Sequence, residues 1–62
     1  MRVKVKKVGD SYWVFISDEE ASGVVRAKEV YAGSKKVEGG PLELEVDKVE
    51  LVDGVAYLWA SP

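Results

Sequence analysis

The chain has 62 residues, and a monomer of this size buries only about 60% of the surface that its unfolded chain exposes, so residues 1–62 hold a single small domain of marginal stability. Cysteine and histidine are both absent, which excludes disulfides, zinc fingers and other Cys/His metal sites, and no metal ion or cofactor is expected. The formal net charge of −2 and a pI near 5.0 argue against indiscriminate binding to nucleic acid.

Residues 2–17 predict a β-hairpin that folds about Gly9 and Asp10. A two-residue turn there sets Val8 opposite Ser11, and the register then places Lys6 opposite Trp13 and Lys4 opposite Phe15. One face of this hairpin is apolar and carries Val3, Val5, Val14 and Ile16, with Tyr12 at its edge. The other face mixes cations with aromatic rings and carries Arg2, Lys4, Lys6, Trp13 and Phe15.

Cations set between aromatic rings on one strand face suit a single-stranded nucleic acid, because the charges meet phosphates and the rings stack on bases. The charge distribution supports this interpretation locally, since residues 1–7 carry four bases and no acid, whereas the rest of the chain carries five bases and eleven acids. The alternative interpretation is that the lysine stems lie over the rings and shield them from water. Acids close to the binding surface would weaken any contact with phosphates.

The middle of the chain predicts a short helix followed by a strand. Residues 17–20 have a capping-box pattern, with Ser17 at the N-cap and Glu20 three residues later. Gly23 and the β-branched residues after it shorten such a helix, and residues 24–31 fit neither a helix nor a strand period cleanly. Residues 33–36 and 38–41 read as loops.

A second hairpin is predicted near the end of the chain. Residues 42–52 read as one strand, Asp53 and Gly54 as a type I′ turn, and residues 55–60 as the returning strand. Counting back from the turn sets Leu51 opposite Ala56 and Lys48 opposite Trp59. The expected fold is therefore mainly β, a small barrel built from two hairpins joined by a short helix/strand connector.

Both hairpins resemble those of the AbrB/MazE swapped-hairpin (SpoVT/AbrB) DNA-binding family. Gly9, Ser11, Val14 and Ile16 match the family's opening motif, and residues 51–54 match its closing hairpin. The chain departs from the family pattern at Asp10, Phe15 and Ser17, and its connector over residues 18–42 is longer than the family's.

This resemblance implies an intertwined homodimer that binds DNA as a transcriptional regulator or as an antitoxin. It also implies that Lys6, Lys7 and Ser11 face phosphates or base edges. The expected nucleic-acid-binding residues, from the hairpin face and the resemblance together, are Arg2, Lys4, Lys6, Lys7, Ser11, Trp13 and Phe15.

Two other functions stay open at this point. A small barrel of the SH3 or OB type would bind RNA or single-stranded DNA, on its own or as a subunit of a ribonucleoprotein such as the ribosome. A protein-interaction module would dock a protein partner on the rings of Trp13, Tyr57 and Trp59. Catalysis is not expected, because neither His nor Cys is present and the acids of residues 18–20 fit a helix cap better than a cation site.

The composition also bears on origin and location. Asn, Gln, Thr and Cys are missing while Val, Lys and Glu are abundant, a bias typical of thermophilic and archaeal-like proteins, although a designed sequence can share it. No apolar run is long enough for a membrane span or a signal peptide. A cytoplasmic protein without a membrane partner is expected.

Overall fold

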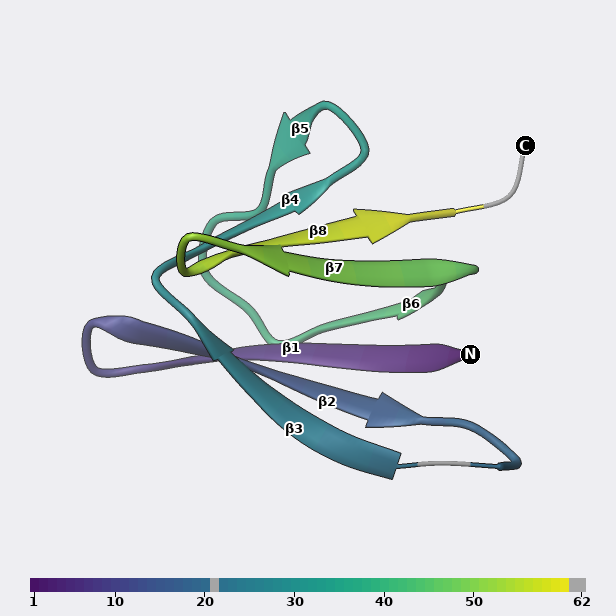
Figure 1. Ribbon diagram of the computed structural model, residues 1–62. Coiled ribbons are helices and arrows are strands. Elements are labelled where there is room, and N and C mark those ends of the chain that lie inside the picture. Colours follow the sequence, from purple (N-terminus) through teal and green to yellow (C-terminus); the bar gives the residue numbers. More distant parts are fainter. Residues whose placement is uncertain (21, 61–62) are drawn as a thin grey trace.

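The computed structural model describes residues 1–20 and 22–60, and these residues form strands and no helix. The strands are β1 (Arg2–Val8), β2 (Ser11–Ser17), β3 (Ser22–Ala27), β4 (Glu29–Ala32), β5 (Lys35–Lys36), β6 (Leu42–Glu45), β7 (Lys48–Val52) and β8 (Val55–Trp59). They make two four-stranded sheets, with the orders β3-β2-β1-β6 and β5-β4-β8-β7 (Figure 1). Among the described residues no helix is long and apolar enough to cross a membrane.

Two bent segments belong to both sheets and close the structure into a barrel. β3 continues into β4 through Lys28, whose backbone N–H donates to the carbonyl of Gly54 at 2.7 Å. β6 continues into β7 through Val46 and Asp47, and the N–H of Asp47 donates to the carbonyl of Trp59 at 2.7 Å. The pairing therefore runs in a ring from β1 through β2, β3/β4, β8 and β7/β6 back to β1, with β4 and β8 parallel and the other neighbours antiparallel. The expectation of a mainly β small barrel is confirmed.

Both predicted hairpin registers are confirmed. Val8 lies opposite Ser11 in the first hairpin, and Val52 lies opposite Val55 in the second. Positive φ angles of 51° at Asp53 and 79° at Gly54 give the second hairpin its type I′ turn, whose twist matches that of the flanking strands.

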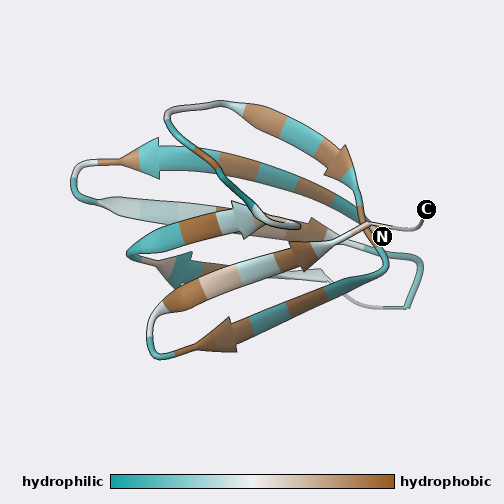
Figure 2. Cartoon of the chain, turned by 90° about the horizontal axis from the view of Figure 1, so that it is seen from above, coloured by the Kyte–Doolittle hydropathy of each residue, from teal (hydrophilic) through white to brown (hydrophobic). Residues whose placement is uncertain are grey.

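The core lies between the two sheets and is built by alternation along the strands, which Figure 2 shows as successive hydrophobic and hydrophilic residues. The largest side chains that are fully buried are Leu58, Val3, Val5, Val14 and Val30. Because every second residue of β1, β2 and β8 points into this core, the remaining residues of these strands are left for the outer faces.

The helix predicted in the connector is wrong, because the described residues of this segment form a turn and a strand. β2 runs to Ser17, and β3 returns beside it over Ser22–Ala27, since the β-branched residues there favour a strand and Val25 and Ala27 can turn inward. The carboxylate of Asp18 accepts the N–H of Glu19 at 2.7 Å within this exposed turn. Ala21, which also fell in the predicted helix, lies outside the described residues.

Two further strand boundaries differ from the prediction. The strand expected over residues 42–52 bends at Val46 and Asp47, so its halves lie in different sheets. Lys35 and Lys36, expected in a loop, form the short strand β5 against β4. The bend arises because β6 pairs with β1, which is distant in sequence and which local composition does not encode. β5, in contrast, pairs with β4 locally, across the two-residue turn of Gly33 and Ser34.

Candidate nucleic-acid interface

Three rows of side chains cross the outer face of the first sheet, because residues paired on adjacent strands point to the same side. Starting from the end near the Gly9-Asp10 turn, the rows are Arg26, Trp13 and Lys6; then Val24, Phe15, Lys4 and Glu43; then Ser22, Ser17, Arg2 and Glu45. We call this surface the aromatic-basic face. Its aromatic strand β2 and its cationic strand β1 are neighbours, as the hairpin register predicts.

The aromatic part of this face consists of Trp13 and Phe15. Their ring centroids lie 6.3 Å apart with the planes tilted by 33°, so the two rings form a short apolar strip along β2. Phe15 is exposed and Trp13 is half-buried. Both rings can therefore offer contact area to a ligand without unfolding any of the strand.

Arg26 is a member of the site that sequence reasoning did not include. Its guanidinium carbon lies 5.7 Å from the centroid of the Trp13 ring, which is a cation–π distance. The strand pairing sets it directly opposite Trp13, so the ring has Lys6 on one neighbouring strand and Arg26 on the other. The sequence signal for Arg26 was its position in the two-residue alternation of a strand. This signal was not used, because a helix was predicted for the segment.

Acidic side chains gather at the opposite end of the face. Glu43 lies beside Lys4 and Glu45 beside Arg2 on the paired strands β6 and β1, and the Glu45 carboxylate is 3.5 Å from the ammonium group of Met1. A hollow of about 470 Å³ near Arg2 is lined by Ser17, Asp18, Glu19 and Glu45 as well. Lys6 and Arg26 are both paired with Trp13, so the acids of β6 offset their charges less than those of Lys4 and Arg2.

Five of the seven residues expected from the sequence belong to the aromatic-basic face, and Lys7 and Ser11 do not. Lys7 is paired with Tyr12, on the side of the sheet that faces inward, and its ammonium nitrogen is 5.8 Å from the Tyr12 ring. Ser11 lies on the same side as Trp13 but next to the turn, where it is half-buried. The expected role of Lys7 beside Lys6 is not supported by the pairing, because adjacent residues of a strand point to opposite faces.

The second sheet carries aromatic rings on its own outer face. Tyr31 of β4 and Tyr57 of β8 are paired across the parallel strands, and their rings are stacked with centroids 5.7 Å apart and an angle of 16°. Trp59, two residues after Tyr57, is 42% exposed. Charges balance on this face, where Lys48 and Glu50 form an ion pair at 3.1 Å. The sequence indicated Tyr57 and Trp59, but Tyr31 joins them only through the long-range pairing of β4 with β8.

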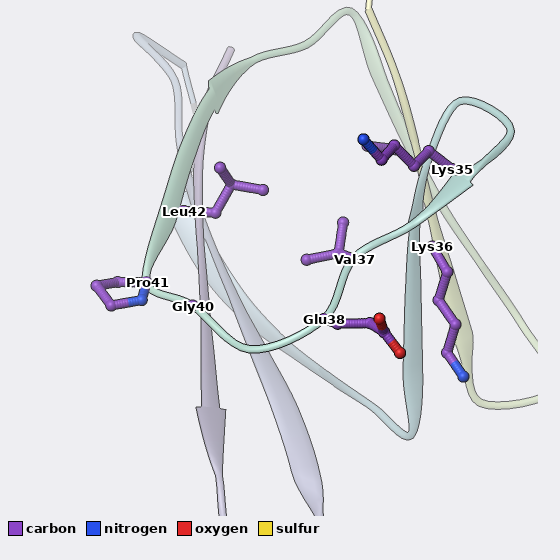
Figure 3. A pocket seen from close by; sticks show the side chains of 8 residues that line it. Lys35, Lys36, Val37, Glu38, Gly40, Pro41 and Leu42 are labelled. Atoms are coloured by element: carbon purple, nitrogen blue, oxygen red, sulfur yellow. The ribbon is translucent and has the colours of Figure 1, made fainter.

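A cleft of about 380 Å³ lies where the chain passes from β5 to β6, and Figure 3 shows Val37 and Leu42 pointing into it. Lys35 and Lys36 also line it, and Glu38 is the one carboxylate among the described residues of the lining. Among the described residues, no group of three or more acidic side chains is placed so that it could hold a metal ion.

No protein-family model matches this chain, and comparisons with curated proteins and with solved structures find no match. The resemblance of the hairpins to the AbrB/MazE family stays a prediction, and so do the expected homodimer, the thermophilic origin and the cytoplasmic location.

Proposed function

We propose that this protein binds single-stranded nucleic acid on the aromatic-basic face. The observation that carries the proposal is the position of the Trp13 ring, with Lys6 on one neighbouring strand and the Arg26 guanidinium 5.7 Å away on the other. A ring offers a stacking surface to any base, and cations on both sides of it meet the phosphates that precede and follow that base. The same residues lie on paired strands, so little ordering of the backbone is needed when a ligand binds.

The architecture supports the same function. Five-stranded barrels of the OB type bind oligonucleotides on the face of their second and third strands, with the loops between strands 1 and 2 and between strands 4 and 5 beside it. In this chain the corresponding face is that of β2 and β3, and the turns after β1 and β7 lie at the same end of the barrel (Figure 1). The backbone contact between Lys28 and Gly54 ties the end of β3 to the second of these turns. Because a fold alone does not define a function, the argument rests on the side chains of the face.

The preference for single strands follows from the rings. Trp13 and Phe15 can stack only on bases that are not already stacked in a duplex, and the groove edges of a duplex offer them no equivalent surface. The proposal covers both RNA and single-stranded DNA, since both present phosphates and bases on which rings can stack.

The test is a titration of the protein with fluorescein-labelled oligonucleotides, single-stranded DNA, single-stranded RNA and the duplex of the same sequence, followed by anisotropy. Binding to a single strand at lower protein concentration than to the duplex supports the proposal. With Arg2, Lys4, Lys6 and Arg26 as the cations of the face, the slope of log K against log salt is expected to be no steeper than about −3, at about 0.7 per phosphate contact. Absence of binding to either single strand at low salt contradicts the proposal, and tighter binding to the duplex favours the regulator that the family resemblance implies.

A protein-binding function is the second candidate, favoured by the face of the second sheet. The stacked pair of Tyr31 and Tyr57, the exposed ring of Trp59 and the balanced charges nearby fit an aromatic contact with another protein. Such a contact weakens little with salt, which separates it from the first candidate.

A further inference from the structure

The free edges of the two sheets differ in their protection against pairing with another strand. β3 and β6 are the edges of the first sheet, and β5 and β7 are those of the second. Three of these edge strands, β5, β6 and β7, carry two charged side chains each. These are Lys35 and Lys36 on β5, Glu43 and Glu45 on β6, and Lys48 and Glu50 on β7. Charged side chains of this kind discourage edge-to-edge association.

β3 is the exception. It is the longest of the four edges, with six residues, and Arg26 is its one charged side chain. Val24, at the middle of this strand, is 51% exposed, and the strand contains no proline or lysine. Among the described residues none pairs with the outer side of β3, so the longest edge is the one open to a further strand.

The positions of the free backbone groups follow from the first hairpin. In a two-residue hairpin the residues that flank the turn, here Val8 and Ser11, exchange both of their backbone hydrogen bonds, and every second pair along the ladder does the same. The alternate residues of β2, starting with Tyr12, therefore direct their backbone groups toward β3. Across that ladder their partners are Ala27, Val25 and Gly23, so the N–H and C=O groups of Ser22, Val24 and Arg26 point to the open side.

We propose that β3 pairs antiparallel with β3 of a second copy of this chain, about a two-fold axis at Val24. In this register Val24 faces Val24 of the second copy, and Ser22 of each chain faces Arg26 of the other, so no like charges meet. All three outward-facing residues find backbone partners, and the exposed Val24 side chains contact each other as a β-branched pair. Shifting the axis to Arg26 would set two guanidinium groups against each other, which disfavours that alternative.

The pairing joins the first sheets of the two copies into one sheet of eight strands, with both aromatic-basic faces on the same side. Phe15 is the neighbour of Val24 on β2, so an apolar row runs from Phe15 of one copy through the two valines to Phe15 of the other. This part of the inference rests on the proposed function, because it gives one nucleic-acid strand two sets of stacking rings. The dimer itself does not depend on nucleic acid.

The test is the mass of the protein in solution, measured by sedimentation equilibrium over a range of concentrations without nucleic acid. The wild-type chain is expected to reach the mass of a dimer, and Val24→Lys, which sets two ammonium groups against each other, is expected to be a monomer. Val52→Lys is the matched control, since Val52 is 50% exposed on the edge strand β7 and the charge change is the same. Circular dichroism and thermal melting verify that each variant is folded.

A second pair of variants tests the register without altering Val24. Ser22→Glu places a carboxylate opposite Arg26 of the second copy and is expected to lower the dissociation constant by about two- to tenfold, whereas Ser22→Lys is expected to raise it by a similar factor. A wild-type monomer at every concentration overturns the proposal, and so does a dimer that Val24→Lys and both Ser22 variants leave unchanged. Mass and oligonucleotide binding are measured separately. A monomeric wild type therefore disproves the dimer without affecting the proposed function, and absence of oligonucleotide binding disproves the function without affecting the dimer.

Discussion

The guanidinium group of Arg26 lies beside the indole ring of Trp13, 5.7 Å from its centroid, although the two residues are thirteen positions apart in the chain. The contact arises because β3 pairs with β2 in a register that sets them directly opposite each other. The charge of Arg26 is therefore held beside the ring at a cation–π distance.

Replacing Trp13 with alanine is expected to weaken binding to single strands by about 1–3 kcal/mol, the range for loss of one stacking ring. Binding to a duplex is expected to change much less. Trp59→Ala is the matched control, because Trp59 is the same residue type on the outer face of the other sheet. Anisotropy titrations of both variants provide the measurement, and equal losses in the two would show that the ring of Trp13 has no special part in binding.

The double substitution Lys4→Glu and Lys6→Glu is expected to abolish binding to single strands while the barrel stays folded. It reverses the charge beside Phe15 and Trp13, although each new carboxylate on β1 can cost about 0.2–1 kcal/mol of stability if it faces another acid, as at Glu43. The double substitution Lys35→Glu and Lys36→Glu changes the net charge equally but lies on β5 of the second sheet. Binding that falls equally in both double variants would indicate a dependence on net charge alone.

Removing the negative charge of Glu43 is expected to strengthen binding. Glu43 lies directly opposite Lys4 across β6 and β1, so Glu43→Gln leaves the lysine with its full charge for a phosphate and removes a repulsion. The affinity at low salt is expected to rise, and the gain is expected to vanish as salt is added, because exposed charges are screened. Glu38→Gln, in the segment between β5 and β6, serves as the control, and an equal gain there would argue against a local effect.

Truncating Leu58 tests the core. Its side chain is 1% exposed between the sheets, and Leu→Ala at such a site costs about 2–5 kcal/mol, a large part of the roughly 3–9 kcal/mol expected for a chain of this length. Leu58→Ala is therefore expected to be largely unfolded or to melt far below the wild type. Leu51→Ala, at a position 51% exposed, is expected to change the free energy of unfolding by less than about 1 kcal/mol. Chemical denaturation followed by tryptophan fluorescence gives both free energies of unfolding. Similar losses of stability in the two variants would contradict a core centred on Leu58.

The sequence by itself determined the two hairpins and the division of their faces. Two-residue turns at Gly9-Asp10 and Asp53-Gly54 are local signals, and once each turn is placed the period of two along a strand assigns every side chain to one face or the other. For this reason the residue order alone places Trp13 and Phe15 on one face with the cations Arg2, Lys4 and Lys6.

Only the tertiary structure decided what lies beside these hairpins. The pairing of β3 with β2 brought Arg26 to Trp13, the pairing of β6 with β1 brought Glu43 to Lys4, and the parallel pairing of β4 with β8 stacked Tyr31 on Tyr57. Each of these pairs joins segments whose own residues were compatible with a helix, a loop or another strand partner. Their arrangement follows from burying one shared core between two sheets, and that free energy depends on the whole chain rather than on any local stretch of it.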